Sequence, residues 1–65
     1  MIYRLQNHEG HITIRRYPKG SQIGERWDKG LKKWVEQCAP LSACEIDNYD
    51  KPITETEAVM HGIVP

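Results

Sequence analysis

The sequence predicts one small α+β domain, in which a three-stranded, mostly antiparallel sheet packs on one long amphipathic helix. Two patterns carry this prediction. Residues 1–17 alternate apolar and polar side chains around a turn-rich tetrapeptide, which is typical of a β-hairpin. Residues 21–38 repeat apolar side chains at spacings of three and four, which is typical of a helix with one buried face. At 65 residues the chain has room for a single domain, residues 1–65.

The first two strands are predicted at residues 1–6 and 11–17, with a turn between them. Tyr3 and Leu5 share one face of the first strand, and Ile12 and Ile14 share one face of the second. The alternation stops after the second strand, because proline and glycine in close sequence break a strand. These two strands would form an antiparallel pair with one apolar face.

The long helix is predicted over residues 21–38, with Ser21 as its N-cap. Glu25 and Lys29 form an acid-first pair four residues apart, which stabilises a helix by about 0.3 kcal/mol. Pro40 would end the helix, because the residue before a proline disfavours the helical conformation. The apolar side chains at helical spacing are Ile23, Trp27, Leu31, Trp34, Val35 and Cys38.

A third strand is predicted at residues 43–49, where apolar and polar side chains alternate. The residues that follow, Asp50-Lys51-Pro52, would form a turn. Thr54 and Glu57 fit a capping box, so a short C-terminal helix is expected to begin there. It would run through His61 and close at Gly62, since glycine is common just after the end of a helix.

The predicted element order is β-β-α-β-α, with the third strand beside the first in a sheet of order 2-1-3. Beside the second strand it would run parallel, and the connection would have to be right-handed. In the preferred arrangement the long helix covers one face of the sheet and forms the core with it. Trp27, Leu31, Trp34 and Val35 of the helix would pack against Leu5, Ile12, Ile14 and Ile46 of the sheet.

The other face of the sheet would carry charged and aromatic side chains. It is expected to be solvated, with ion pairs from Arg4 to Glu45 or Asp47. The alternative is a contact surface, since Tyr and Arg are enriched in binding hot spots. The residues on this face would be Ile2, Arg4, Thr13, Arg15, Tyr17, Glu45, Asp47 and Tyr49. Cys38 and Cys44 are expected in the core as small apolar residues, and a disulfide between them is left open.

Charge is sorted along the chain. The first 33 residues hold eight of the nine Lys and Arg side chains and three acids, so their formal charge is +5. Residues 34–65 hold one base and six acids, so their formal charge is −5 and the whole chain is formally neutral. A separation of this kind bears on binding surfaces and association rates, and not on the fold.

No pattern in the sequence indicates catalysis, a cofactor or a metal, and the protein is expected to be non-enzymatic. His8 and His11 stand three apart in the predicted turn, but zinc needs three or four ligands. Nucleophile motifs, a redox C-x-x-C and a glycine-rich phosphate loop are absent from the sequence. An apolar run of about eighteen residues and a secretory signal pattern are absent too. The expected location is therefore cytoplasmic, without a membrane span.

Two binding functions agree with the charge pattern. In the preferred one, the protein docks stoichiometrically on a basic surface of a protein or of a protein–nucleic acid complex, and complementary charge raises the association rate. This acidic patch consists of Glu45, Asp47, Asp50, Glu55 and Glu57. In the alternative, a small nucleic-acid-binding regulator contacts phosphates with basic side chains. This basic patch consists of Arg15, Arg16, Lys19, Arg26, Lys29 and Lys33.

The small size and the mini α/β layout resemble the accessory proteins of phages and mobile elements, including inhibitors of bacterial defence systems. The resemblance implies an inhibitor or adaptor that acts by binding, and it assigns no role to any residue. Self-association is a further expectation, because a small sheet with unpaired edge strands leaves a homodimer open.

Overall fold

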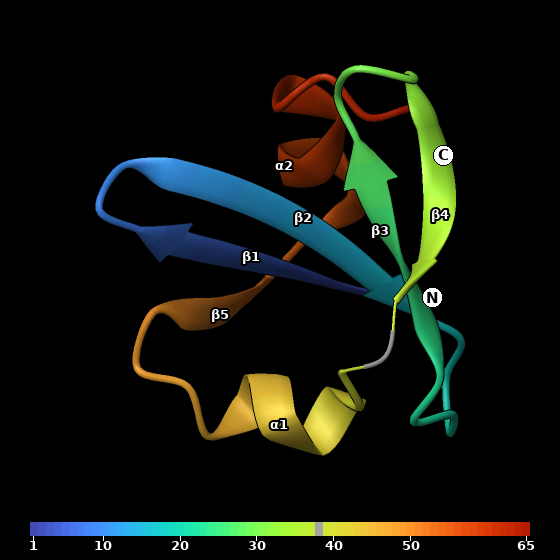
Figure 1. Cartoon of the computed structure of the whole chain (residues 1–65). Helices are drawn as coiled ribbons and strands as arrows, with labels where there is room; N and C mark the ends of the chain where they lie inside the picture. The colour runs from blue at the N-terminus through green and yellow to red at the C-terminus, as the bar shows by residue number, and fades with distance from the viewer. Residues whose placement is uncertain (38) are drawn as a thin grey trace.

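The computed structural model describes residues 1–37 and 39–65, which form a five-stranded antiparallel sheet and two short helices (Figure 1). The strand order is β4-β3-β2-β1-β5, so four consecutive strands form a meander and the last strand returns to lie beside the first. The strands are β1 (Ile2–His8), β2 (His11–Tyr17), β3 (Gly24–Asp28), β4 (Lys33–Gln37) and β5 (Asp50–Ile53). The helices are α1 (Leu41–Glu45) and α2 (Glu55–Met60). The predicted three-stranded sheet on one long helix is therefore wrong.

The predicted hairpin of β1 and β2 is confirmed. His8 lies opposite His11, so the connection is a two-residue turn of Glu9 and Gly10. Both turn residues have positive φ, 53° and 83°, as a type I′ turn requires. The Asn7 side chain also accepts a hydrogen bond from the Gly10 backbone at 3.1 Å. The turn fixes the register of the two strands along their whole length.

The predicted long helix is replaced by the β3–β4 hairpin. Trp27 lies directly opposite Trp34, and the two rings meet edge to face with their centroids 5.3 Å apart. The connecting turn is held by Asp28, whose side chain accepts the Leu31 backbone N–H at 2.9 Å. Two aromatic residues seven apart fit one stripe of a helix, but they also fit facing positions of a hairpin with a four-residue turn. Cys38, the last residue of the predicted stripe, lies outside the described residues.

Gly24, at the start of β3, is required by the close approach of β2. A Cβ at this position would collide with the carbonyl oxygen of Arg16 and with the ring of Tyr17. Only two residue pairs join β2 to β3, namely Arg15 with Arg26 and Arg16 with Glu25. The two strands therefore touch at one end and diverge at the other, as Figure 1 shows.

The predicted third strand is also wrong, because its residues form α1 and the turn after it. Pro40 precedes this helix instead of ending a longer one. The first backbone N–H groups of α1 are satisfied from the β2–β3 loop, where Gln22 accepts from Leu41 at 3.3 Å and from Ser42 at 2.9 Å. The strand that lies beside β1 is β5, formed by the residues for which a turn was predicted.

The predicted C-terminal helix is confirmed as α2. Thr54 is its N-cap, and the reciprocal bonds of a capping box join Thr54 and Glu57. Gly62, with a φ of 97°, follows the C-cap residue His61.

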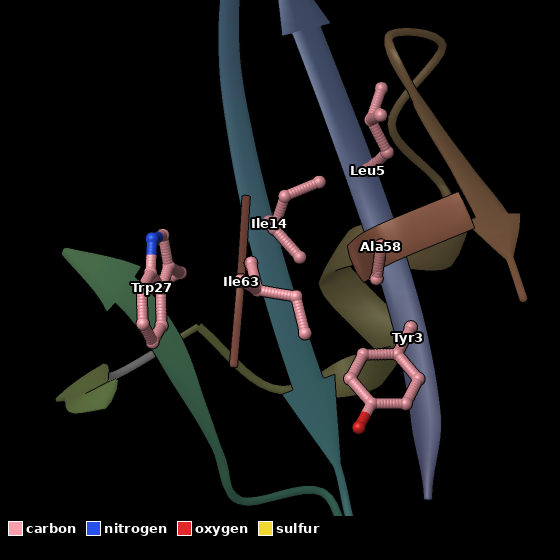
Figure 2. Close-up of a cluster of buried hydrophobic side chains, with 6 residues drawn as sticks. All are labelled: Tyr3, Leu5, Ile14, Trp27, Ala58 and Ile63. Atoms are coloured by element: carbon pink, nitrogen blue, oxygen red, sulfur yellow. The ribbon is translucent and has the colours of Figure 1, made fainter. Parts of the chain in front are cut away.

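The apolar core lies on both faces of the sheet. On one face, Ala58 of α2 and Ile63 after it pack over β1, β2 and β3 (Figure 2). On the other face, Leu41 and Cys44 of α1 pack on Tyr17. Of the predicted core, Leu5, Ile14 and Trp27 are buried and Ile12 and Trp34 pack against them, whereas Leu31 and Ile46 are 61% and 84% exposed. Cys44 is a buried free thiol, as predicted for a small core residue.

Candidate functional site

Three arginines lie side by side across the sheet. Arg4 of β1 is directly opposite Arg15 of β2, and Arg15 is directly opposite Arg26 of β3. Directly paired residues point to the same face, so the three guanidinium groups form one line, here called the arginine row. Like charges at such positions destabilise a sheet. The predicted basic patch lacks Arg4, although the register fixed by the β1–β2 turn places this residue opposite Arg15.

One buried carboxylate partly neutralises this row. Arg4 donates from Nε to Oδ1 of Asp50 at 2.7 Å, and Nη1 of Arg15 lies 3.7 Å from Oδ2 of the same group. The Asp50 side chain is 1% exposed. The predicted partners of Arg4, Glu45 and Asp47, are therefore wrong. Two guanidinium groups therefore share the Asp50 carboxylate.

Arg15 continues the network toward the α1–β5 loop. It donates to the Gln6 side chain at 3.1 Å, and Gln6 donates in turn to Asp47 at 2.8 Å. The Asp47 carboxylate also accepts the backbone N–H of Tyr49, and these two hydrogen bonds lower the pKa of Asp47. Nε of Arg15 and Oδ2 of Asp50 are both buried and have no hydrogen-bond partner among the described residues.

The outer part of the row is open and basic. Arg26 is half-buried, and the described residues form no ion pair with it. Lys33 lies on the same face of β4, opposite Asp28, and Lys29 lines the same cavity as Arg26. We call the set of Arg15, Arg26, Lys29 and Lys33 the basic face. It adjoins the part of the sheet that α1 covers.

The basic face unites four of the six residues of the predicted basic patch. The other two lie elsewhere. Arg16 points to the opposite face of the sheet, where it pairs with Glu25 at 2.8 Å and stacks 4.1 Å over the ring of Trp34. Lys19 is exposed in the loop between β2 and β3.

The predicted acidic patch does not form one surface. Asp50 is buried beneath the arginine row. Glu57 belongs to the capping box, and its hydrogen bonds from Thr54 lower its pKa. Glu45 lies on α1 and Glu55 lies on α2. The two helices pack on opposite faces of the sheet, so these two acids are separated. Of the five acids, Glu45 and Asp47 remain close together, on either side of the exposed Ile46.

The thiol of Cys44 lies against a tyrosine. Its Sγ is 3.2 Å from the hydroxyl of Tyr17, which also donates to the Ala39 carbonyl at 2.8 Å and accepts from Gln37 at 2.6 Å. Burial, with a further contribution from Cys44, raises the pKa of Tyr17 to about 12. Tyr17 is protonated at neutral pH and uses its proton for the Ala39 carbonyl, and its contact with Cys44 lies inside the cluster that packs α1 on the sheet.

The rest of the described chain has no second cluster of charged side chains comparable to the arginine row. Residues 1–37 and 39–65 gather no group of three His, Cys, Asp or Glu side chains that could hold a metal ion. His8 packs edge to face on Tyr49, with the centroids 4.8 Å apart. Neither described helix is long and apolar enough to span a bilayer.

Comparison with protein-family models, with curated proteins and with solved structures finds no match to this chain. The expectation of a phage-type inhibitor is not supported. It rested on size and on a mini α/β layout, and the layout proved to be mostly strands.

Proposed function

We propose that this protein binds nucleic acid through the basic face, by contacts to the phosphate backbone. The observation that carries the proposal is the outer end of the arginine row, where Arg26 lies directly opposite Arg15 and has no ion-pair partner among the described residues. Keeping like charges adjacent on a sheet costs stability, and a polyanion offsets that cost. Arg16, on the opposite face, has an acidic cross-strand partner in Glu25, whereas Arg26 has none among the described residues.

The chemistry of the face favours phosphates over bases. Arginine donates to two phosphate oxygens at once, and each neutralised phosphate releases bound counterions. Thr13 and Val35, which lie beside Arg15 and Arg26 on this sheet face, have no ring on which a base could stack, and the rings of His11 and Trp27 lie only at its edge, in the cavity that Arg26 and Lys29 line. The expected binding is therefore stoichiometric, dependent on salt and weakly dependent on sequence.

Two charge-matched double variants test the proposal. Arg26→Gln with Lys33→Gln removes two charges from the basic face. Lys19→Gln with Lys51→Gln removes two charges from exposed sites outside it. Both change the formal net charge by the same amount, so a difference between them reports position. The assay is fluorescence anisotropy of a labelled single-stranded oligonucleotide at several salt concentrations, with a duplex in parallel.

Phosphate contacts from Arg26, Lys29 and Lys33, the three members of the basic face without a carboxylate ion pair among the described residues, predict a slope of roughly −2 for log K against log salt on single strands, at about −0.7 per contact. The first double variant should reduce the slope to about a third and weaken binding, and the second should leave both near those of the parent. The proposal is refuted if the parent fails to bind at low salt, or if both double variants lose affinity equally.

A second candidate is docking on a basic protein through the α1–β5 loop. The observation that favours it is the exposure of Ile46 and Tyr49, 84% and 56%, beside the Glu45 and Asp47 carboxylates. An apolar anchor flanked by acids suits a basic partner surface. Tyr49 also borders a hollow of about 290 Å³.

The probe for this candidate is an oligolysine peptide that contains leucines. Docking predicts amide NMR shifts confined to residues 45–49 and weakened by Ile46→Ser and by Glu45→Gln. Shifts spread evenly over all exposed acids, or unchanged in these variants, would exclude it.

A further inference from the structure

A wedge-shaped cavity opens where β2 and β3 diverge. The last pair that joins the strands is Arg15 with Arg26, yet β2 begins at His11 and β3 runs on to Asp28. The two strand ends separate beyond that pair (Figure 1). The cavity between them has a volume of about 140 Å³. It is lined by His11, Ile12, Thr13, Arg26, Trp27 and Lys29.

The lining of this wedge suits an anion. Arg26 and Lys29 bring two positive charges and His11 brings a third nitrogen donor, while the lining residues include no carboxylate. The nearest acid along β3, Asp28, turns its Oδ1 toward the backbone N–H of Leu31 at 2.9 Å. At roughly 30 Å³ per water molecule, the volume equals that of between four and five waters, so a group with four oxygens fits.

The backbone of β2 adds a donor to the same wedge. In a hairpin closed by a two-residue turn, His8 and His11 form the first hydrogen-bonded pair, and such pairs alternate along the strands. The backbone N–H of Ile12 therefore points away from β1, toward the side of β3. β3 does not pair with β2 at this position, so this N–H faces the wedge.

We propose that the wedge binds one phosphate group, with Arg26, Lys29 and the Ile12 N–H donating to its oxygens and the His11 ring as a further donor beside them. The inference rests on the proposed function for the source of the phosphate, which would be the backbone of the bound nucleic acid. Charge-assisted hydrogen bonds from arginine and lysine, supported by a backbone N–H, are a common means of holding phosphate. Because Arg26 belongs both to the wedge and to the basic face, the bound phosphate would hold the nucleic-acid strand at the outer end of the arginine row.

The first experiment uses sodium phosphate alone, at constant ionic strength set with sodium chloride, and follows the protein by ¹H–¹⁵N NMR. Phosphate in the wedge should shift the Ile12 amide and the Trp27 indole along one saturable curve. The Trp34 indole, which donates to the Val64 carbonyl at 2.8 Å, is the internal control. Lys29→Gln should raise the Kd for phosphate about fivefold, and Lys19→Gln should change it less than twofold.

The second experiment separates this inference from the proposed function by repeating the titration with an oligonucleotide. Shifts at Ile12 with both ligands support the inference in full. Saturable binding of phosphate without binding of the oligonucleotide identifies a site for free phosphate and refutes the proposed function. If the oligonucleotide binds without shifting the Ile12 amide and Trp27 indole signals, the inference of a phosphate site in the wedge is overturned. The proposed binding of nucleic acid by the basic face then still stands. Phosphate shifts that do not saturate, or that Lys19→Gln weakens equally, also overturn it.

Discussion

Replacement of Asp50 by alanine tests whether the arginine row is held by one buried carboxylate. The Arg4 and Asp50 side chains are 10% and 1% exposed, so both are largely removed from water. Asp50→Ala would leave Arg4 buried without a counter-charge and directly opposite Arg15. Removing one partner of a buried ion pair costs about 3–5 kcal/mol. For 65 residues the whole free energy of unfolding is about 3–10 kcal/mol, so the variant should lose about a third or more of its stability.

The measurement is urea unfolding followed by tryptophan fluorescence, with Glu45→Ala as the charge-matched control. Glu45 is exposed, so its removal should change stability by no more than about 0.5 kcal/mol. The double variant Arg4→Met with Asp50→Leu removes the closest ion pair, at 2.7 Å, and should recover part of the loss, because apolar residues of similar size often replace a buried ion pair without cost. The recovery should be incomplete, because Arg15 loses the same carboxylate and keeps only its hydrogen bond to Gln6. An Asp50→Ala protein that unfolds within about 1 kcal/mol of the parent would refute the reasoning.

Three further predictions concern stability. Because the pKa of Tyr17 is raised to about 12, the parent should lose stability as the pH rises from 10 to 12. Urea midpoints at pH 9 and 11 measure this loss, which Tyr17→Phe should remove and Tyr49→Phe should not. Thr54→Ala should lower the free energy of unfolding by about 1 kcal/mol, measured by thermal unfolding. It should also raise the lowered pKa of Glu57, measured by NMR titration. Gly24→Ala should prevent cooperative thermal unfolding, because its Cβ meets the β2 backbone; an unchanged melt would contradict the steric argument.

Local signals predicted their elements well. The β1–β2 turn needs only two adjacent residues with positive φ, and the α2 capping box needs only a threonine and a glutamate three apart. Both features are complete within about ten residues, so no distant contact could override them. The prediction of a buried Cys44 was right for a different reason, since it packs from a helix and not from a strand.

The segment from Ser21 to Pro40 was predicted wrongly because its apolar spacing fits two structures. The predicted helix contains Gly24 and Gly30, which are unfavourable inside a helix, and Asp28, two residues before Gly30, is a turn signal. Packing of Trp27 on Trp34 and the close approach of β2 decide for the hairpin. The predicted basic patch was partly reassembled by the sheet, whereas the acidic patch was divided because α1 and α2 pack on opposite faces.

The distance along the chain between Arg4 and its carboxylate has a consequence for the order of folding. The β1–β2 hairpin can close as soon as its turn is made, yet this places Arg4 against Arg15 with no acid nearby. Asp50 arrives 46 residues after Arg4, on a strand that pairs only when nearly the whole chain is present. A hairpin of two strands is only marginally stable in water, and this one places two arginines side by side, so a nascent chain that lacks β5 is expected to remain unfolded on the ribosome. The ion pair therefore makes stable folding of β1 depend on the synthesis and pairing of β5.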